Sequence, residues 1–418
     1  MHVPRDSYNI IGAGVFGAST ALHLIRKYPR ARIRLFDRQP FPSTLAASWD
    51  LNKVIRTDYA ELRYMELAME ALKAWKSDPL FKEFYHEDGI FWISDTDLTG
   101  RIVENYKRLG VDEGYALLSI DEAKRAYKGV FEDADYTGVM EVLANKNSGW
   151  AEAEEVMEKT IQAAVDSGVE YVVADIVSLH IVDRSVCCGV RSSNGRCYGA
   201  EHTVLCTGAG TTKLLANTAP EWDELQVGNR LLAAAICTGQ VKLNADDNRQ
   251  LSNTPVCCQD VLPGRGGGLP PTSNQELKFW VDIPFRNTVK LDDGRMISSP
   301  KYKQQPSQAM KDELDSVKFA IYGEKGRHLT LESYRICWDA VTPDEDFIIS
   351  PHPHCKELFI ATAGSFHGWK FMPILGKYIV KMMESELEPE LEKAWAWDRE
   401  YTGEPADMWP RREMGDLV

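Results

Sequence analysis

A glycine triplet between two apolar runs near the N-terminus constrains the fold more than any other feature of this chain. Gly12, Gly14 and Gly17 have the spacing G-x-G-x-x-G and lie between residues 8–11 and 33–36, whose apolar side chains indicate strands. A run with helical periodicity joins the triplet to the second strand. The pattern predicts a strand, a tight turn, a helix and a second strand, which together form a dinucleotide-binding unit.

Each residue type in this unit has a chemical reason. Gly12 permits the tight turn, Gly14 lets the backbone approach a pyrophosphate, and Gly17 allows the helix to pack closely on the strand. The helix N-terminus offers free N–H groups and the positive end of its dipole to the anion. Asp37 follows Gly17 by 20 residues. At the end of the second strand its carboxylate can bind a ribose 2′-hydroxyl, and it would repel the 2′-phosphate of NADP.

The motif alone does not separate NAD from FAD, but the rest of the chain favours FAD. Residues 203–210 predict another strand and a turn of small residues, and residues 331–376 predict strand, loop, strand, glycine-rich turn and helix. The nucleotide-binding pattern therefore returns twice, as expected when a large cofactor contacts several segments. Residues 230–299, with alternating strands and Pro/Gly-rich turns, indicate a sheet-rich insertion.

The predicted class is α/β, or α+β over the whole chain, with a discontinuous nucleotide domain. The predicted FAD-binding domain comprises residues 1–85, 148–215 and 330–395, the substrate domain comprises 86–147 and 216–329, and 396–418 form a C-terminal tail. Helices are predicted at 61–76, 121–127, 152–165 and 306–321, and strands at 84–94, 170–173, 177–182 and 187–190.

Composition and charge argue against several classes of function. The 418 residues carry a formal net charge of −14, which disfavours nucleic acid or an anionic membrane as a partner. No apolar run approaches the roughly 20 residues needed to span a bilayer. The N-terminus lacks a signal-peptide pattern and the C-terminus is not a peroxisomal SKL signal, so we expect a cytoplasmic protein. We also expect a monomer.

Cysteine usage points to reduced thiols and away from a metal centre. The nine cysteines are an odd number and include no C-x-x-C pair. The adjacent pairs Cys187–Cys188 and Cys257–Cys258 do not have the spacing of metal ligands, so no metal site is expected. A cysteine with a function is therefore expected to be reactive rather than bridging.

Residues 332–373 and several shorter motifs carry a resemblance to a known family. The segments ESYRICWDAVTPDEDFIISPHP and LFIATAGSFHGWKFMP, with GAGVFG, DLNKVIR, NSGW, CTGAG and ELKFW, are similar to those of the sarcosine oxidase family of flavoproteins. They resemble above all the fungal branch with fructosyl amino acid oxidases (amadoriases) and saccharopine and pipecolate oxidases. The resemblance implies a Rossmann-like FAD-binding domain with an inserted substrate domain, as in glutathione reductase and D-amino acid oxidase.

The glycine motif and the resemblance together imply a set of FAD contacts. The predicted cofactor-binding residues are Gly12, Gly14, Val15, Phe16, Gly17, Asp37, Arg38, Ser48, Lys53, Cys337, Gly364, Phe366, Gly368 and Lys370.

By resemblance, Cys337 tethers FAD covalently through a thioether to the flavin 8α-methyl group, with Arg335, Trp338 and Asp346 in register around it. From the cysteine alone, a buried structural role would be favoured. Lys278, in ELKFW, matches the lysine that this family places over the flavin, where a positive charge would assist the reaction with O2. The alternative for Lys278 is a strand lysine that faces solvent.

The resemblance also implies how substrate is bound. Lys53 would lie against the flavin ring, and Arg56 and Lys370 would hold the substrate carboxylate. The alternative for Arg56 is a surface ion pair with Asp58 or Glu61.

Three more residues complete the predicted substrate site. Asp282 stands where amadoriases carry a glutamate that meets the polar arm of the substrate, although a turn aspartate before Pro284 is the alternative. Trp369, together with Trp280, could form a wall of the pocket. Arg411, in the C-terminal tail, could reach the mouth of the pocket, as a C-terminal arginine does in amadoriases.

The implied reaction is oxidation of a secondary amine in an N-substituted amino acid. A hydride would pass from the carbon beside the neutral amine to flavin N5, water would hydrolyse the resulting imine, and O2 would reoxidise the flavin with release of hydrogen peroxide. An alternative within the family is a biosynthetic oxidase of an N-methyl amino acid intermediate whose imine is trapped by cyclisation. Alternatives outside it are an NAD-dependent dehydrogenase and a protein that binds flavin without turnover.

Overall fold

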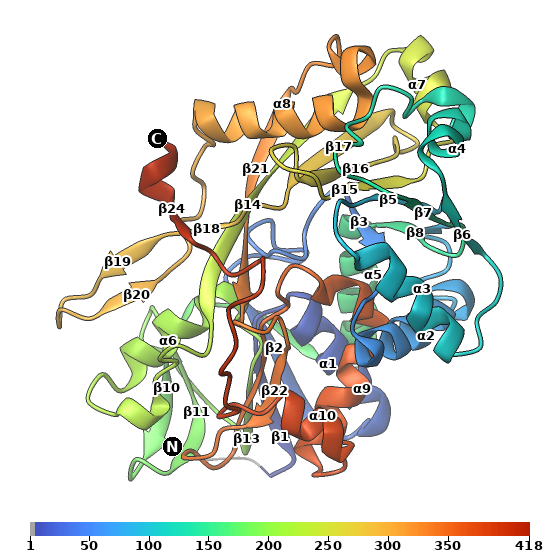
Figure 1. The fold of residues 1–418 in the computed structure, drawn as a ribbon. Coiled ribbons are helices and arrows are strands. Elements are labelled where there is room, and N and C mark those ends of the chain that lie inside the picture. The colour runs from blue at the N-terminus through green and yellow to red at the C-terminus, as the bar shows by residue number, and fades with distance from the viewer. Residues whose placement is uncertain (1–4) are drawn as a thin grey trace.

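A parallel sheet built from three distant parts of the chain forms the lower layer of the molecule in Figure 1, a computed structural model that describes residues 5–418. Its first five strands are parallel, and the last pairs antiparallel with its neighbour. In spatial order, the strands are β9 (Glu170–Val173), β2 (Arg32–Asp37), β1 (Ser7–Ile11), β13 (His202–Leu205), β23 (Leu358–Thr362) and β22 (Ile348–Pro351).

Helices cover one face of this sheet, and a small antiparallel sheet covers the other. Helix α1 (Val15–Lys27) contacts α5 (Ala153–Asp166) and α9 (Met372–Met383). At the α1–α9 contact, a Cβ on Gly376 would overlap the carbonyl oxygen of Ser19, so the two backbones touch. On the opposite face lie β10 (Ile176–Val182), β11 (Val186–Ser192), β12 (Cys197–Gly199) and α6 (Thr211–Thr218).

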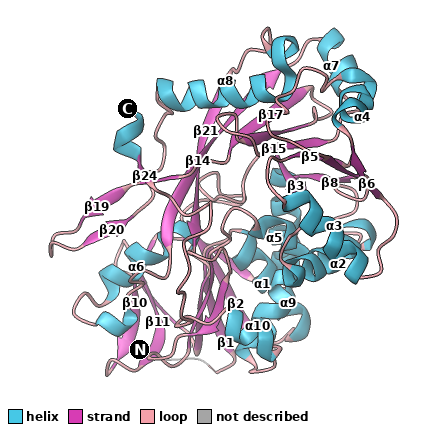
Figure 2. Cartoon of the chain, in the orientation of Figure 1, coloured by secondary structure: helices cyan, strands magenta, loops and turns pink. Residues whose placement is uncertain are grey.

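A second, larger sheet of ten strands forms the upper layer, and α8 (Gln308–Tyr322) packs along it (Figure 2). Its strands, in spatial order, are β24 (Arg412–Glu413), β18 (Phe285–Arg286), β14 (Leu232–Lys242), β17 (Glu276–Val281), β16 (Gly266–Leu269), β15 (Val256–Gln259), β5 (Ile90–Ile93), β7 (Val142–Asn145) and β6 (Tyr115–Leu118), with β21 (Ser333–Val341) also paired with β14.

The remaining elements are short or lie at the edges of these layers. Strands β3 (Asn52–Ile55) and β4 (Tyr85–His86) both pair with β8 (Gly149–Glu152). Strands β19 (Thr288–Lys290) and β20 (Met296–Ser298) form a separate hairpin. The other helices are α2 (Leu62–Ser77), α3 (Leu98–Arg108), α4 (Ile120–Arg125), α7 (Ala245–Leu251) and α10 (Pro389–Ala394). Within residues 5–418, no helix is both long and apolar enough to cross a bilayer.

The glycine unit folds as its sequence predicts. Gly12 has φ 102°, a left-handed conformation that favours glycine, and a Cβ there would overlap the carbonyl oxygen of Cys206, directly after β13. A Cβ on Gly17 would overlap the carbonyl oxygen of Gly12, so only glycine lets α1 pack this closely on the turn. The α/β class is confirmed.

Two of the predicted elements differ from the structure. The single strand predicted at 84–94 is divided into β4 and β5, which belong to different sheets. Gly89, between them, has φ 85° and breaks the run. The helix predicted at 121–127 ends at Arg125, because Tyr127 and Lys128 have left-handed backbone conformations. In both places a local turn overrides the periodicity of the side chains.

Candidate active site

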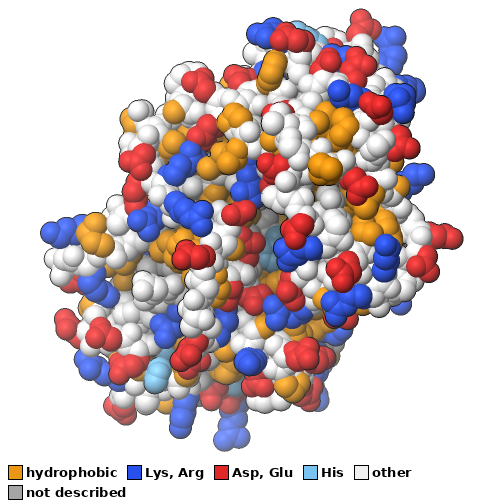
Figure 3. All heavy atoms as spheres, in the orientation of Figure 1, with side chains coloured by type: hydrophobic (Ala, Val, Ile, Leu, Met, Phe, Trp, Pro, Cys, Tyr) orange, Lys and Arg blue, Asp and Glu red, His pale blue; other side chains and the backbone are white. Residues whose placement is uncertain are grey.

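One long cavity of about 1070 Å³ lies between the two main sheets. It runs from the glycine turn after β1, past β3, β17 and β21, to a mouth near residues 406–408 of the tail. Its lining therefore comes from segments that are hundreds of residues apart in sequence. On the visible outer face of the molecule, acidic and basic side chains are interspersed, without an extended patch of one sign (Figure 3).

The inner end of the cavity has the groups that a dinucleotide requires. Gly12, Gly14, Val15 and Phe16 line it, while Gly17 does not and packs against the strand instead. In the same region Asp37 accepts hydrogen bonds from the backbone N–H of Ala13 at 3.0 Å and of Arg38 at 2.8 Å. These bonds fix the Asp37 carboxylate at the end of β2, where a ribose hydroxyl can donate to its remaining lone pairs.

Two further side chains support this assignment. The hydroxyl of Ser48 is buried without a hydrogen-bond partner in the described chain and lies 3.3 Å from where a Cβ of Gly14 would be. A buried hydroxyl of this kind needs an acceptor from a ligand. Nearby, the guanidinium of Arg38 lies 4.8 Å from the centre of the Tyr302 ring, and both side chains line the cavity. Tyr302 was not predicted to line the cofactor site, because it is remote in sequence from Arg38.

The middle of the cavity is organised by one buried carboxylate shared between two lysines. Asp50 is 2% exposed, and its Oδ2 lies 2.7 Å from Nζ of Lys278 and 3.0 Å from Nζ of Lys53. Lys278 also donates to the carbonyl oxygen of Asn52 at 2.7 Å. The Lys278 side chain is 4% exposed, so the solvent-facing alternative for it is wrong.

Burial and charge act in opposite directions on these three groups. Burial alone would raise the pKa of Asp50, but the charges of Lys278, Lys53 and Arg335 outweigh it and hold the pKa far below its usual range. Burial lowers the pKa of Lys278 to about 8, although Asp50 opposes the shift. For Lys53, burial is outweighed by Asp50, and the pKa is raised. Two cations thus share one anion, and the cavity here has excess positive charge.

Cys337 lies beside this cluster on β21, opposite Ile236 of β14. It is 3% exposed and lines the cavity, and it belongs to none of the hydrophobic clusters among residues 5–418. Its Sγ lies 3.8 Å from the carbonyl oxygen of Ala47. The thiol therefore faces the space where a ligand binds and not the protein core.

A strained turn forms the wall next to Cys337. Ala363, Ser365 and Phe366 have φ of 64°, 46° and 59°, which non-glycine residues rarely adopt. The carboxylate of Asp339, two residues after Cys337 on β21, accepts hydrogen bonds from the backbone N–H of Phe366 at 2.9 Å and of Ala340 at 2.8 Å. Burial raises the pKa of Asp339, and these two bonds partly offset the shift.

The other residues predicted in this turn also line the cavity. Gly364 is tightly packed, because a Cβ there would lie 3.1 Å from Asp339 and 3.4 Å from the ring of Phe16. Gly368 and Trp369 follow, and the Trp369 ring stacks on Trp75 with centroids 5.4 Å apart. The sequence did not single out Asp339, although its alternation with Arg335 and Cys337 along RICWD places all three on one face of the strand.

Arg56 and Lys370 face the same part of the cavity, and neither has an acidic partner. Arg56 donates to the backbone carbonyl of Asp58, and Lys370 donates to the carbonyl oxygen of His367 at 2.8 Å. Across residues 5–418, no carboxylate lies within ion-pair distance of either cation. The predicted alternative, an ion pair of Arg56 with Asp58 or Glu61, is therefore wrong.

The charge on Lys370 is destabilised by its surroundings. Burial, and then the charge of Arg56, hold the pKa of Lys370 well below its usual range. The carboxylate of Asp58 is not within ion-pair distance of either cation, although its charge interacts with that of Arg56 at longer range, and it accepts hydrogen bonds from Ser148 at 2.8 Å and from Asn145 at 2.9 Å. An anion bound between Arg56 and Lys370 would relieve this excess of positive charge.

The outer part of the cavity contains the remaining predicted residues, except one. Asp282 lines the cavity and accepts a hydrogen bond from the indole N–H of Trp280 at 2.9 Å. Burial raises the pKa of Asp282. Arg411 does not line the cavity: its side chain is exposed and donates to the carbonyl oxygen of Pro405 at 3.1 Å. The tail turns back on itself at this point, so the prediction for Arg411 is not met in the structure.

A different arginine stands at the mouth. Arg265 lies 2.8 Å from the carboxylate of Asp260 and 2.9 Å from that of Asp407, which comes from the tail. All three residues line the cavity. The sequence offered no signal for the bridge between Arg265 and the tail, because Asp407 is remote from Arg265 in sequence. Among residues 5–418, no group of three His, Cys, Asp or Glu side chains could hold a metal ion.

The chain is similar to known proteins over most of its length. Residues 8–382 match the family described as FAD dependent oxidoreductase. L-saccharopine oxidase from Schizosaccharomyces pombe is 26% identical over 93% of this chain and 92% of that protein. Monomeric sarcosine oxidase from Arthrobacter sp. is 24% identical over 91% and 93%. The structure of the fructosamine oxidase Amadoriase II from Aspergillus fumigatus in complex with FSA has a TM-score of 0.83 at 27% identity, covering 94% of this chain and 90% of that one.

Replacing Asp50 tests how much its carboxylate, shared by Lys278 and Lys53, contributes to the stability of the protein. In Asp50→Asn, Lys278 and Lys53 lose their counter-charge in a buried site, and we expect a loss of about 3–5 kcal/mol in the free energy of unfolding, measured by urea denaturation at pH 7. The exposed pair of Asp246 and Arg249 is the control, and Asp246→Asn should cost at most about 1 kcal/mol.

The difference in the free energy of unfolding between wild type and Asp50→Asn should change with pH in a direction set by the pKa of Asp50. Because the pKa of Asp50 is held below its usual range in the folded chain, its contribution is complete above the ordinary carboxyl pKa of about 4 and is lost as the pH falls below it. The difference in the free energy of unfolding between wild type and Asp50→Asn should therefore become smaller at acidic pH. A gap that stays constant from pH 7 to pH 3 would show that the Asp50 charge is not its source.

Proposed function

This chain belongs to the FAD-dependent oxidoreductase family, and from that premise we propose that it is an oxidase of N-substituted amino acids. The secondary amine of the substrate would be oxidised while its carboxylate binds between Arg56 and Lys370. One observation carries the proposal: these two cations line one cavity without a counter-ion among residues 5–418. Family membership also excludes the NAD-dependent alternative.

The relatives support this class of substrate. Their names include L-saccharopine oxidase and sarcosine oxidase, and both named compounds are amino acids substituted on nitrogen. The chain itself acts on CH–NH groups as an oxidoreductase.

The residues that line the cavity fit FAD along its whole length. Gly12, Gly14 and Ser48 would hold the pyrophosphate, and Asp37 would hold the ribose. Bound FAD supplies an acceptor for the hydride of the amine and passes the electrons on to O2. Cys337, whose thiol lines the cavity, would attach the cofactor covalently. An S–C bond would replace the S–H bond of Cys337 and one C–H bond of the flavin 8α-methyl group, and the two electrons released would pass through the flavin to O2.

The domain organisation is proposed on the same basis. Residues 1–85, 148–215 and 330–395 contribute all strands of the parallel sheet, which supports their assignment to the FAD-binding domain. Strand β21, within the third of these segments, pairs with β14 of the other sheet and so brings Cys337 to the boundary between the two layers.

The charge of the cavity favours a neutral amine. Four basic side chains, Arg56, Lys370, Lys53 and Lys278, line the cavity, and only Lys53 and Lys278 have an ion-pair partner, Asp50. A protonated amine among them would be repelled, so the substrate binds with its nitrogen lone pair free. That lone pair assists departure of the hydride from the adjacent carbon. The protein therefore needs no dedicated general base for this step.

Lys278 would have a separate role in the reaction with O2. Its ammonium is held in place by Asp50 at 2.7 Å and by the carbonyl oxygen of Asn52 at 2.7 Å. A fixed positive charge stabilises the anion that forms when O2 takes up an electron, and it does so without reorganisation. Lys53 adds to the positive potential from the other side of Asp50.

The experiment that tests the function is a peroxide assay of the purified protein with sarcosine, pipecolate, saccharopine and fructosyl lysine. Release of hydrogen peroxide with one or more of these amines is the expected result. A yellow protein that reduces no member of the panel, and releases no peroxide, would contradict the proposal and favour a protein that binds flavin without turnover.

For carboxylate recognition, we expect Lys370→Met to raise KM for the best substrate about 10-fold to 100-fold, because a charge-assisted hydrogen bond is lost in a buried site. For the amide of the same substrate, which lacks the negative charge, KM should rise much less. Lys377→Met, which removes a partly exposed lysine of α9 that pairs with Glu70 of α2, is the control and should leave KM unchanged. An equal rise in KM for acid and amide would remove Lys370 from carboxylate binding.

For covalent attachment, Cys337→Ser should yield flavin that separates from acid-precipitated protein, whereas the wild-type flavin should stay with the pellet. The control is Cys258→Ser, which changes another buried thiol that lines the same cavity. This variant should retain acid-stable flavin. If Cys337→Ser kept its flavin after acid treatment, the attachment site would lie elsewhere.

For the O2 reaction, Lys278→Met should lower the second-order rate of reoxidation about 100-fold and change reduction by substrate much less. Since the pKa of Lys278 is lowered to about 8, the wild-type reoxidation rate should fall as pH rises through that value, and the variant should show no such decline. Stopped-flow measurement separates the two half-reactions. Lys318→Met, at a buried lysine outside the cavity, is the control. Equal slowing of both half-reactions in Lys278→Met would contradict this role.

A further inference from the structure

One aromatic ring contacts both of the cations that have no counter-ion. The centre of the Tyr59 ring lies 4.1 Å from the guanidinium carbon of Arg56 and 5.5 Å from Nζ of Lys370. Tyr59 is 8% exposed and lines the cavity. The face of an aromatic ring carries negative electrostatic potential, so a cation at this distance is attracted without any ion pair.

The hydroxyl of Tyr59 is anchored by a defined hydrogen-bond chain. Its oxygen lies 3.1 Å from Nδ1 of His367, and Nε2 of His367 lies 2.9 Å from the carbonyl oxygen of Glu345. A carbonyl only accepts, so Nε2 carries the proton, Nδ1 is the acceptor and the Tyr59 hydroxyl donates. Burial and then the charge of Lys370 hold the pKa of His367 well below its usual range, which keeps the ring neutral.

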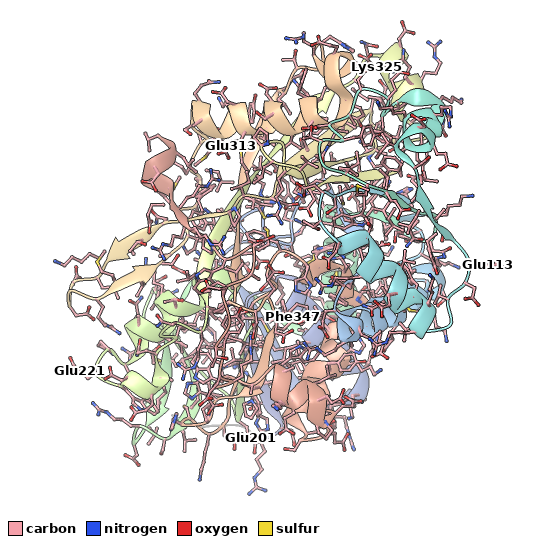
Figure 4. All side chains as sticks on the ribbon, viewed as in Figure 1. Glu113, Glu201, Glu221, Glu313, Lys325 and Phe347 are labelled. Atoms are coloured by element: carbon pink, nitrogen blue, oxygen red, sulfur yellow. The ribbon has the colours of Figure 1, made fainter. Side chains whose placement is uncertain are left out.

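The histidine is itself fixed by packing. Its ring stacks on Phe347, with centroids 5.0 Å apart and planes inclined by 23°. Phe347 is 1% exposed and lies in the middle of the molecule, between the two layers (Figure 4). Lys370, in turn, donates to the carbonyl oxygen of His367 at 2.8 Å. The position of the Tyr59 ring and that of the Lys370 ammonium therefore depend on the same histidine.

We infer that Tyr59 is a positioning residue for substrate binding: its ring stabilises Arg56 and Lys370 as charged groups in the absence of an internal carboxylate and leaves both free to bind the carboxylate of the substrate. A carboxylate from the protein would also stabilise the charges of Arg56 and Lys370, but it would then compete with the carboxylate of the substrate for these two cations. The ring stabilises the cations without offering an anion that must be displaced. This inference rests on the function proposed above.

The other groups that face Lys370 do not change charge near neutral pH. They are Arg56, Lys53, Cys258 and the neutral His367. Asp50 raises the pKa of Lys53, and burial raises that of Cys258 well above its usual range. Burial and the charge of Arg56 lower the pKa of Lys370, so Lys370 loses its charge at a lower pH than an ordinary lysine. Removing the ring should therefore make Lys370 lose its proton at a lower pH.

The test is calorimetric titration of the flavin-loaded protein with propionate, a small carboxylate that cannot be oxidised at an amine. In Tyr59→Leu, which removes the ring, we expect Kd for propionate to rise about tenfold at pH 7, and the loss of affinity with rising pH to begin at a lower pH than in wild type. Tyr59→Phe keeps the ring and loses the bond to His367. It should bind propionate within about threefold of wild type, with an unchanged pH profile.

The variants distinguish positioning from simple packing. If Tyr59→Leu retains flavin and binds propionate as wild type does, with the same pH profile, the inference is overturned and Tyr59 is only part of the core. The inference is also overturned if Tyr59→Phe and Tyr59→Leu weaken propionate binding equally, because the contribution of Tyr59 to the affinity then does not come from its ring. Should Tyr59→Leu fail to fold, equal weakening by Tyr59→Phe and Lys370→Met would overturn it. If wild type itself does not bind propionate, the proposed carboxylate site fails first.

Discussion

A single buried carboxylate holds the functional region together. Asp50 lies in the loop before β3, and it bonds to Lys278 on β17 of the large sheet and to Lys53 on β3 itself. Charges removed from water are stable only when paired, so these three groups bring two parts of the chain to one place. The same pairing leaves one positive charge in excess. The interaction that stabilises this contact therefore also sets the electrostatic potential of the cavity.

The part of the cavity proposed to bind substrate has the opposite arrangement of charges. Arg56 and Lys370 are brought together without an acidic partner, and the nearby carboxylate of Asp58 is fully engaged with Asn145 and Ser148. An unpaired pair of buried cations is unfavourable in the empty protein and becomes favourable when an anion binds. A site of this kind gains specificity for a carboxylate from the cost of leaving the cations unpaired. The middle of the cavity is thus paired for stability, and its substrate end is left unpaired for binding.

Strained backbone conformations also occur in the wall of the cavity. Ala363, Ser365 and Phe366 adopt left-handed conformations in the wall next to Cys337, and Asp339 holds that turn through the N–H of Phe366. Strained residues persist only where surrounding contacts determine their conformation, and they cluster at functional sites. Here the contact comes from the strand that also carries Cys337, so the sulfur and the turn are positioned by one element.

The sequence by itself determined the parts of this protein whose chemistry is local. The glycine spacing and Asp37 predict the nucleotide unit because a tight turn, a helix terminus and a strand end are all specified by neighbouring residues. The motifs around Lys278, Cys337 and Lys370 further pointed to residues that line the same cavity. Only the tertiary structure decided which groups pair: Asp50 with Lys278, Tyr59 with two cations, and Arg265 at the mouth where Arg411 was expected. Burial and pairing depend on distances between segments remote in sequence, and no local pattern encodes those distances.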